Sequence, residues 1–134
     1  MGTISLDRVR DLLRREEESF VKERPRSKAL FEEAKRNWVG GVPMSWMRIW
    51  TGGFPVFVAE AEGVYVTDVD GHRYLDLCLG DTGGLCGHAN PWIVNAVAGQ
   101  MKARGTTTML PTEDVIWVGK ELERRFGLSS WQVL

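Results

Sequence analysis

The chain has 134 residues, of which 43% are hydrophobic and 26% are charged, a balance typical of a globular domain and not of a disordered segment. Its 17 basic and 18 acidic residues nearly cancel, so no strong field attracts a nucleic-acid backbone or an anionic membrane surface. The sequence has neither an apolar run of about 20 residues, as a transmembrane helix requires, nor a signal peptide at its charged N-terminus. We therefore expect a cytoplasmic protein that binds neither nucleic acid nor membrane.

The N-terminal part predicts two helices. From Leu6 to Val21, apolar residues recur at helical spacing between charged ones, which indicates an amphipathic helix that ends at Pro25. Ser27 is placed to cap a second, shorter helix, and Gly40-Gly41 ends it. The apolar side of this second helix carries Leu30, Phe31, Ala34 and Trp38.

The stretch from Val42 to Phe54 is irregular and rich in large apolar residues, with Arg48 as its single charge. Linkers are polar and contain few aromatic residues, so this stretch is not a surface linker. Burying its apolar side chains would be favourable by about 25 cal/mol per Å². The side chains in question are Trp46, Met47, Ile49 and Trp50. Two fates remain open for them, packing in the core or lining a pocket.

A three-stranded antiparallel meander is predicted next. Val56 to Ala59, Val64 to Val69 and Arg73 to Leu77 are β-branched and aromatic runs. Glu62-Gly63 and Asp70-Gly71 separate them as turns, and the glycine of Asp70-Gly71 suits the positive φ of a two-residue hairpin turn.

A glycine-rich loop, Gly80 to His88, connects the meander to a helix that Asn90 caps and Pro91 begins. The apolar stripe of that helix is Ile93, Val94, Val97 and Met101, and Gly105 ends it. The loop is neither a Walker loop nor a dinucleotide-binding motif, so a tight connection is one interpretation. Its polar residues, Asp81 and Thr82, leave open a second one, in which the loop contacts a ligand.

The C-terminal part predicts one more helix and the start of a strand. Thr112 is placed to cap a helix with an acidic first turn, which ends near Phe126-Gly127. Ser130 to Leu134 resembles an apolar strand, and a natural domain seldom ends inside such a strand. We therefore expect the chain to be a portion of a longer polypeptide.

Cysteine and histidine usage favours no structural metal site. Cys78 and Cys86 are too few for a disulfide framework, so we expect reduced thiols. With His72 and His88 they form the order His, Cys, Cys, His, but the paired short spacings of structural zinc are missing. No serine, cysteine or lysine is flanked by a recognisable base, so no nucleophilic triad is proposed.

Four separate elements carry a resemblance to a known family. They are Gly40-Gly41-Val42, then Thr67 to Asp76, then Gly87 to Pro91, then Pro111-Thr112-Glu113. In order and spacing they resemble the class III aminotransferases, and the nearest branch is that of glutamate-1-semialdehyde aminomutase and the β-amino-acid transaminases. The resemblance covers roughly Gly40 to the end of the chain, and it is specific because the four elements match together.

The resemblance implies an α/β enzyme of fold type I that uses pyridoxal 5'-phosphate (PLP) and forms a homodimer with its active site at the subunit interface. In such proteins the aldimine lysine, the acidic partner of the cofactor ring and the phosphate cup follow the strand that here begins near Trp131. We therefore expect no catalytic and no cofactor-binding residue in this chain. Its lysines are interpreted as solvated surface residues: Lys22, Lys28, Lys35, Lys102 and Lys120.

The domain organisation expected from these patterns has three parts. Residues 1–39 form an N-terminal helical arm, residues 40–90 a small antiparallel sheet with the glycine-rich loop, and residues 91–134 the start of the large PLP-binding domain. The portion as a whole is α+β.

The expected function is transfer of an amino group from an amino acid or amine to a keto acid or aldehyde. Arg48, by similarity to the family's carboxylate-binding arginine, is the first substrate-binding candidate, with Trp46, Asp81 and Thr82 beside it. The alternative for Arg48 is an ion pair with Asp81 or Asp76. The aminomutases carry an aromatic residue where Asp81 stands, which argues against aminomutase activity. The alternatives for the protein are an aminomutase or a non-catalytic dimerisation module.

Overall fold

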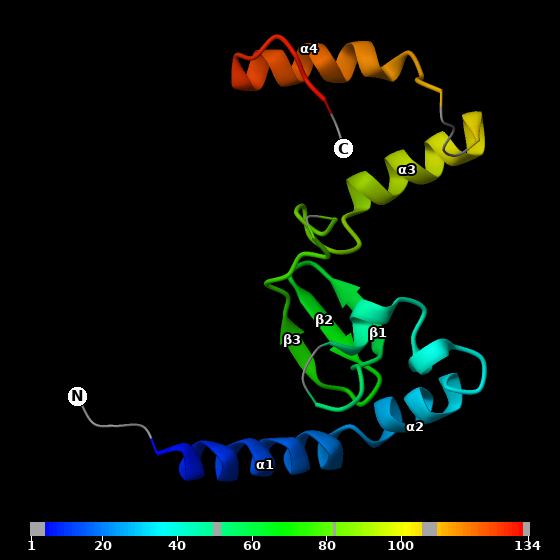
Figure 1. Ribbon diagram of the computed structural model, residues 1–134. Helices are drawn as coiled ribbons and strands as arrows, with labels where there is room; N and C mark the ends of the chain where they lie inside the picture. Colours follow the sequence, from blue (N-terminus) through cyan, green and yellow to red (C-terminus); the bar gives the residue numbers. More distant parts are fainter. Residues whose placement is uncertain (1–4, 50–51, 82, 106–109, 133–134) are drawn as a thin grey trace. The chain divides into compact units, whose positions relative to one another are not determined.

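The computed structural model describes residues 5–49, 52–81, 83–105 and 110–132 (Figure 1). Its elements, with η for 3₁₀ turns, are α1 (Leu6–Glu23), α2 (Pro25–Ala34), η1 (Val39–Gly41), η2 (Ser45–Arg48), β1 (Val58–Glu62), β2 (Tyr65–Asp68), β3 (Arg73–Leu75), α3 (Pro91–Arg104) and α4 (Asp114–Phe126). By internal contacts the chain divides into two compact units, Met1–Ile93 and Val94–Leu134. Among the helices formed by the described residues, none combines the length and apolar character needed to cross a bilayer.

The first predicted helix is confirmed and extends to Glu23. The Ser5 hydroxyl accepts a hydrogen bond from the Arg8 N–H at 3.4 Å, which caps its start. On its surface the Arg14 guanidinium bridges Asp11 and Glu18 at 2.7 and 2.8 Å. No residue of α1 is buried, so these pairs lie in solvent and contribute little to stability.

The second helix begins earlier than predicted. Pro25 occupies its first turn, where the missing N–H of proline costs nothing, so Pro25 starts α2 as well as ending α1. The prediction that Ser27 caps this helix is therefore wrong. Ser27 lies inside the first turn, fully buried, and its hydroxyl donates to Asp70 at 2.7 Å.

The predicted meander is confirmed as an antiparallel sheet in the order β1-β2-β3, with β2 in the centre. Its first strand lies later than predicted, because Glu62, expected in the turn, pairs with Tyr65 as the end of β1. The second turn is longer than the expected two-residue hairpin turn, because Thr67 pairs with Arg73 and five residues lie between them. The backbone N–H of Gly71 donates to the Asp68 carbonyl at 3.1 Å, and Gly71 has the predicted positive φ of 92°. The Asp68 side chain stabilises this wider turn by accepting hydrogen bonds from backbone N–H groups, as described below.

The hydrophobic core of the first unit is small and lies between α2 and the irregular segment that follows it. Phe31, Val42 and Phe54 are its buried residues. The rings of Phe20 and Phe54 are 5.0 Å apart between centroids, which joins α1 to this cluster. Other partly buried residues that pack against the cluster are Val21, Met47 and Phe57.

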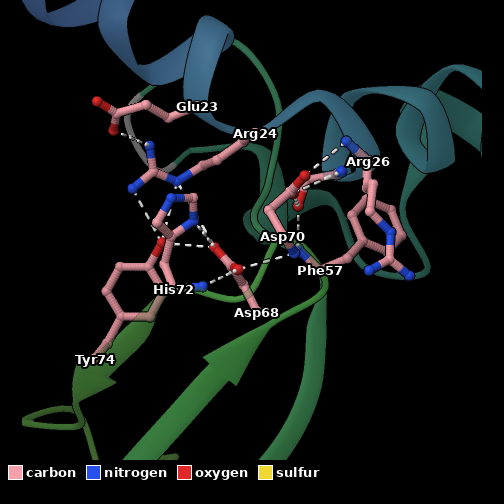
Figure 2. Close-up of polar contacts among 9 residues, drawn as sticks. Glu23, Arg24, Arg26, Phe57, Asp68, Asp70, His72 and Tyr74 are labelled. Atoms are coloured by element: carbon pink, nitrogen blue, oxygen red, sulfur yellow. Dashed lines mark hydrogen bonds and ion pairs between the residues drawn. The ribbon is translucent and has the colours of Figure 1, made fainter.

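A carboxylate on the β2–β3 turn caps α2 from outside the helix. Asp70 accepts hydrogen bonds from the backbone N–H groups of Arg26 and Ser27 at 2.7 and 2.9 Å, in addition to that from the Ser27 hydroxyl (Figure 2). The residue before the helix, Arg24, offers no side-chain cap of its own. Asp70 thus satisfies N–H groups that have no partner inside the helix. These bonds hold the pKa of Asp70 below its usual value, against the opposing effect of burial.

A second carboxylate, Asp68, joins the turn to the α1–α2 junction. Its Oδ1 accepts from the backbone N–H groups of Asp70 and His72 at 2.9 and 2.8 Å. Its Oδ2 accepts from the Tyr74 hydroxyl at 2.7 Å and lies 3.0 Å from His72 Nδ1. The Arg24 guanidinium in turn donates to the Tyr74 oxygen at 3.0 and 3.1 Å (Figure 2).

Asp68 is 1% exposed, and its burial is compensated by these contacts. Burial by itself would raise the pKa of Asp68, but the hydrogen bonds from Tyr74 and His72 hold it below its usual value. Burial, together with the hydrogen bond to Asp68, raises the pKa of Tyr74. The network is therefore built around an ionised aspartate.

The remaining helices begin and end at mostly predicted signals. Asn90 caps α3 by accepting from the Trp92 N–H at 3.0 Å, as predicted. The expectation that Thr112 caps α4 is wrong, because the helix begins at Asp114 and the Thr112 hydroxyl donates to the Asp114 carboxylate at 3.1 Å. Gly127 ends α4 in the left-handed conformation, φ 71°, as predicted.

The predicted strand over residues 130–134 is not formed at residues 130–132, and residues 133 and 134 lie outside the described part of the chain. The Trp131 indole N–H donates to the Leu128 carbonyl at 2.9 Å, and its ring is 5.5 Å from that of Phe126. This local contact uses the side chain that the predicted strand would have directed into a core.

Replacement of Asp68 tests whether the buried carboxylate stabilises the unit. Since the folded pKa of Asp68 is lowered, its contribution is complete above the usual aspartate pKa of about 4 and is lost as pH falls toward the folded value. We expect Asp68→Asn to cost about 2 kcal/mol or more at pH 7 and to flatten the loss of stability below about pH 4. Urea unfolding at several pH values measures both effects.

The control for this experiment is Asp7→Asn on the exposed surface of α1, whose ion pair with Arg10 is open to solvent. It should change stability by less than about 0.5 kcal/mol at pH 7. An Asp68→Asn protein as stable as the wild type, with the same pH dependence, would contradict the role given to this carboxylate.

Candidate functional site

Arg48, the first substrate-binding candidate, ends η2 and is exposed. It borders a hollow whose other polar side chains are Lys35 and Ser45 and whose apolar wall includes Phe54. No carboxylate lines this hollow among the described residues, and because Lys35 is paired with Glu32, its positive charge comes from Arg48. Such a surface suits an anionic group, and the guanidinium can bind a carboxylate through two parallel hydrogen bonds.

The ion pair considered as the alternative for Arg48 is not formed within the described part of the chain. Asp76 instead accepts from His88, and Asp81 has no hydrogen-bond or ion-pair partner among the described residues.

Trp46 lies two residues before Arg48 but lines a different, apolar hollow together with Trp38, Val42 and Phe57. Its indole N–H donates to the Met44 sulfur at 3.1 Å, and about half of its surface is exposed. Trp46 and Arg48 thus border different hollows.

The two fates considered for the neighbours of Trp46 are both observed. Met47 packs against the core cluster, whereas Ile49 is 79% exposed and lines the hollow that Arg48 borders. Trp50 lies outside the described residues.

The glycine-rich loop is closed at its base by Asp76 and His88. The Oδ2 of Asp76 lies 2.7 Å from His88 Nε2, and its Oδ1 accepts from the Cys78 and Leu79 N–H groups at 2.9 and 3.0 Å. His88 and Gly63 exchange two backbone hydrogen bonds, of 2.7 and 2.9 Å, which fix the far end of the loop to the β1–β2 turn. The pKa of Asp76 is lowered mainly by the contact with His88 and further by the two backbone hydrogen bonds.

Asp81 lies within this loop, exposed, in the left-handed backbone region with φ 51°. Leu79 shares this conformation with φ 56°, which is uncommon for residues with a side chain. A hydrogen bond from the Gly84 N–H to the Leu79 carbonyl, 2.7 Å long, holds the loop together. The Asp81 carboxylate is thus presented to solvent on a constrained backbone. Thr82, the remaining candidate, lies outside the described residues.

The histidines and cysteines do not converge on one point. His72 contacts Asp68 and His88 contacts Asp76, while Cys78 and Cys86 are both free and exposed. Among the described residues no three potential metal ligands lie together.

The lysines of this chain do not fit the aldimine-forming lysine of a PLP site. All of them are exposed, and Lys35 is paired with Glu32 at 2.7 Å. An aldimine lysine needs a desolvated environment that lowers its pKa, and an exposed ammonium lacks it. The described residues therefore supply no cofactor attachment point.

Two polar clusters were missed by the sequence analysis. The sequence predicts Asp68 in a strand, Asp70 in a turn, and Asp76 in a strand and as a potential partner of Arg48, but not the contacts these aspartates make. A signal was present in each case, since aspartates bracket the turn that precedes His72, and Asp76 and His88 flank the glycine-rich loop. Sequence spacing does not show which of these groups approach one another.

Comparison with known proteins now identifies the family. The sequence model of the family described as Aminotransferase class-III matches residues 47–132, which includes the sheet, the glycine-rich loop, α3 and α4. The chain belongs to the class-III aminotransferase family.

Among its relatives, the chain is 40% identical over 102 residues to a glutamate-1-semialdehyde 2,1-aminomutase of Methanocaldococcus jannaschii, with 75% of this chain and 23% of that protein covered. It is 44% identical over 90 residues to the protein of the same name from Roseiflexus castenholzii, with 66% of this chain and 20% of that protein covered. The chain thus spans about a quarter or less of these relatives' length.

Solved structures give the same result for the fold. A glutamate-1-semialdehyde aminomutase from Pseudomonas aeruginosa PAO1, solved also in complex with PMP, matches with a TM-score of 0.85 and 48% identity, covering 98% of this chain and 29% of that one. A β-phenylalanine aminotransferase from Variovorax paradoxus matches with a TM-score of 0.73 and 28% identity, covering 89% and 27%. The chain has the mixed α/β fold of the N-terminal portion of a fold type I aminotransferase, as predicted.

Each histidine can be removed to test whether it constrains its own loop. In His88→Ala, the glycine-rich loop loses the contact at its base, so we expect faster amide hydrogen exchange over residues 77–87. In His72→Ala, the matched control, faster exchange should be confined to the β2–β3 turn. Peptide-resolved hydrogen exchange measures both. Equal exchange over the glycine-rich loop in the two variants would contradict the proposed constraint.

Proposed function

We propose that this chain is the N-terminal portion of a PLP-dependent aminotransferase that transfers an amino group from an amino acid or amine to a keto acid or aldehyde. The observation that carries the proposal is the match to the class-III family across the sheet and the glycine-rich loop. The PMP complex of the similar aminomutase supports the cofactor. PLP, when bound, supplies the electron sink for amino-group chemistry, and this chain supplies substrate contacts.

Aminomutase activity is the second candidate function. The identities to aminomutases, up to 48%, exceed the 28% identity to the β-phenylalanine aminotransferase, which favours it. Asp81 argues against aminomutase activity, because an exposed carboxylate makes the substrate-facing wall more polar than the aromatic residue that the aminomutases carry there.

The two reactions differ in the number of substrates, which gives the test. The full-length protein is incubated with glutamate 1-semialdehyde alone, and then with an amino acid and a separate keto acid. We expect turnover only with the pair of substrates. Turnover of glutamate 1-semialdehyde alone would establish an aminomutase, and no turnover and no PLP binding would favour a non-catalytic module.

The proposal includes two kinds of macromolecular partner, the rest of the polypeptide and a second subunit in a homodimer. Exposed large apolar residues on α3 and α4 support it, since side chains of this kind are favourably buried against a partner. They include Trp92, Val94 and Val97 on α3 and Val115, Ile116 and Trp117 on α4. A cytoplasmic location stays a prediction from the sequence.

Within this function we propose that Arg48 binds the substrate carboxylate, with Trp46, Asp81 and Thr82 as further candidates for the substrate-facing surface. The exposed guanidinium, which has no carboxylate partner among the described residues, supports this role for Arg48. Lysine cannot reproduce its two parallel hydrogen bonds.

Arg48→Lys in the full-length protein tests the role. We expect KM for amino acids to rise about tenfold to a hundredfold, which corresponds to ~1.5–3 kcal/mol for a charged hydrogen bond, and KM for amines without a carboxylate to change little. Steady-state kinetics with matched substrates measure the difference. Arg36→Lys, at an exposed arginine that does not line the hollow of Arg48, is the control. Equal losses for both substrate types would assign Arg48 a structural role.

A further inference from the structure

The guanidinium of Arg48 lies directly against the backbone of Gly40. A Cβ atom built on Gly40 would lie 2.6 Å from Nη1, 2.8 Å from Cζ and 2.9 Å from Nε of Arg48. Real Cβ atoms essentially never approach other heavy atoms below 3.0 Å. Nη1, Cζ and Nε are thus at similar distances from the position of this Cβ. The flat face of the guanidinium therefore covers the space that a side chain at Gly40 would fill.

The position of Gly40 is itself fixed by the core. The next residue, Gly41, is also left-handed, and a Cβ there would lie 2.6 and 2.8 Å from ring atoms of Phe31. Phe31 is one of the buried core residues, and the Gly41 N–H donates to the Trp38 carbonyl at 2.9 Å. Gly41 therefore packs against the core, and Gly40 packs against the guanidinium of Arg48.

This arrangement restricts a side chain that would otherwise be mobile. Arg48 is exposed and has no ion pair among the described residues, so no carboxylate fixes the orientation of its guanidinium. Binding a carboxylate through two parallel hydrogen bonds requires that orientation, and ordering a free arginine side chain on binding costs conformational entropy. A flat contact with a rigid backbone reduces that cost.

We propose that Gly40 is a positioning residue for the substrate carboxylate, because the absence of a side chain there holds the Arg48 guanidinium in a binding-competent orientation. The inference rests on the proposed function of Arg48. A simpler explanation for the glycine is the turn alone, since φ 73° and ψ 16° favour glycine at this position.

Gly127 separates these two explanations. It has nearly the same backbone conformation, φ 71° and ψ 12°, but a Cβ there would meet nothing within 4 Å among the described residues. Gly40→Ala and Gly127→Ala therefore introduce the same backbone strain, and only Gly40→Ala displaces a guanidinium.

The experiment compares the two variants in the full-length protein by steady-state kinetics and by calorimetric titration with glutarate, an unreactive carboxylate. We expect both to lower the unfolding temperature. Only Gly40→Ala should raise KM for an amino acid, by about tenfold or more, and weaken glutarate binding similarly, with little change in KM for an amine that lacks a carboxylate.

Two further variants make the result decisive. In Gly40→Ala/Arg48→Ala the atoms that the new Cβ would meet are gone, so this protein should be less destabilised relative to Arg48→Ala than Gly40→Ala is relative to the wild type. This holds as a test even if Gly40→Ala alone fails to fold. Because the guanidinium is the far end of a flexible side chain, this difference in stability should be small. A larger loss of stability in the Arg48→Ala background, or equal glutarate affinity of Gly40→Ala and Gly127→Ala, would overturn the inference.

The kinetic results separate the inference from the proposed function. If Arg48→Lys raises KM for amino acids but Gly40→Ala behaves like Gly127→Ala, the positioning role fails and the role of Arg48 stands. If Arg48→Lys leaves KM for amino acids unchanged, the proposed function of Arg48 fails, and the inference fails with it.

Discussion

The hydrogen bonds from α2 to the Asp70 carboxylate are the contacts on which the first unit depends. A helix leaves its first N–H groups without internal partners, and here the residue before the helix provides no cap. The hydrogen-bond partner comes from a turn more than forty residues later in the chain, so the start of α2 and the β2–β3 turn hold each other in place. Asp68 extends the same principle to the α1–α2 junction by way of Tyr74 and Arg24.

From this frame a short sequence of contacts leads to the candidate site. The cap fixes the start of α2, α2 carries Phe31 into the core, and Phe31 packs on Gly41 beside Gly40. The core itself contains few buried residues among those described, so apolar packing alone fixes the structure of the unit only in part. Directional hydrogen bonds fix the rest of the arrangement. Their effect on Arg48 is transmitted through backbone and aromatic-ring contacts and does not depend on charge.

Sequence analysis was most reliable where a signal is local. The amphipathic pattern of α1, the Asn90 cap and the Gly127 terminus need only neighbouring residues, and all three are confirmed. The caps assigned to Ser27 and Thr112 failed because the side chains have other acceptors within reach, Asp70 and Asp114. The candidate site could be predicted only in part for the same reason, since no sequence pattern shows which hollow a side chain borders.

The polar bonds between the turn and the helix junction also bear on how homologous proteins can be recombined. Apolar surfaces tolerate small sliding movements, but a carboxylate that accepts two backbone N–H groups does so at one register only. Inserting or deleting a single residue at 24–27 or at 68–72 would break that register. A chimera that exchanges the helical arm between relatives would therefore keep its native arrangement only if the β2–β3 turn is exchanged together with it.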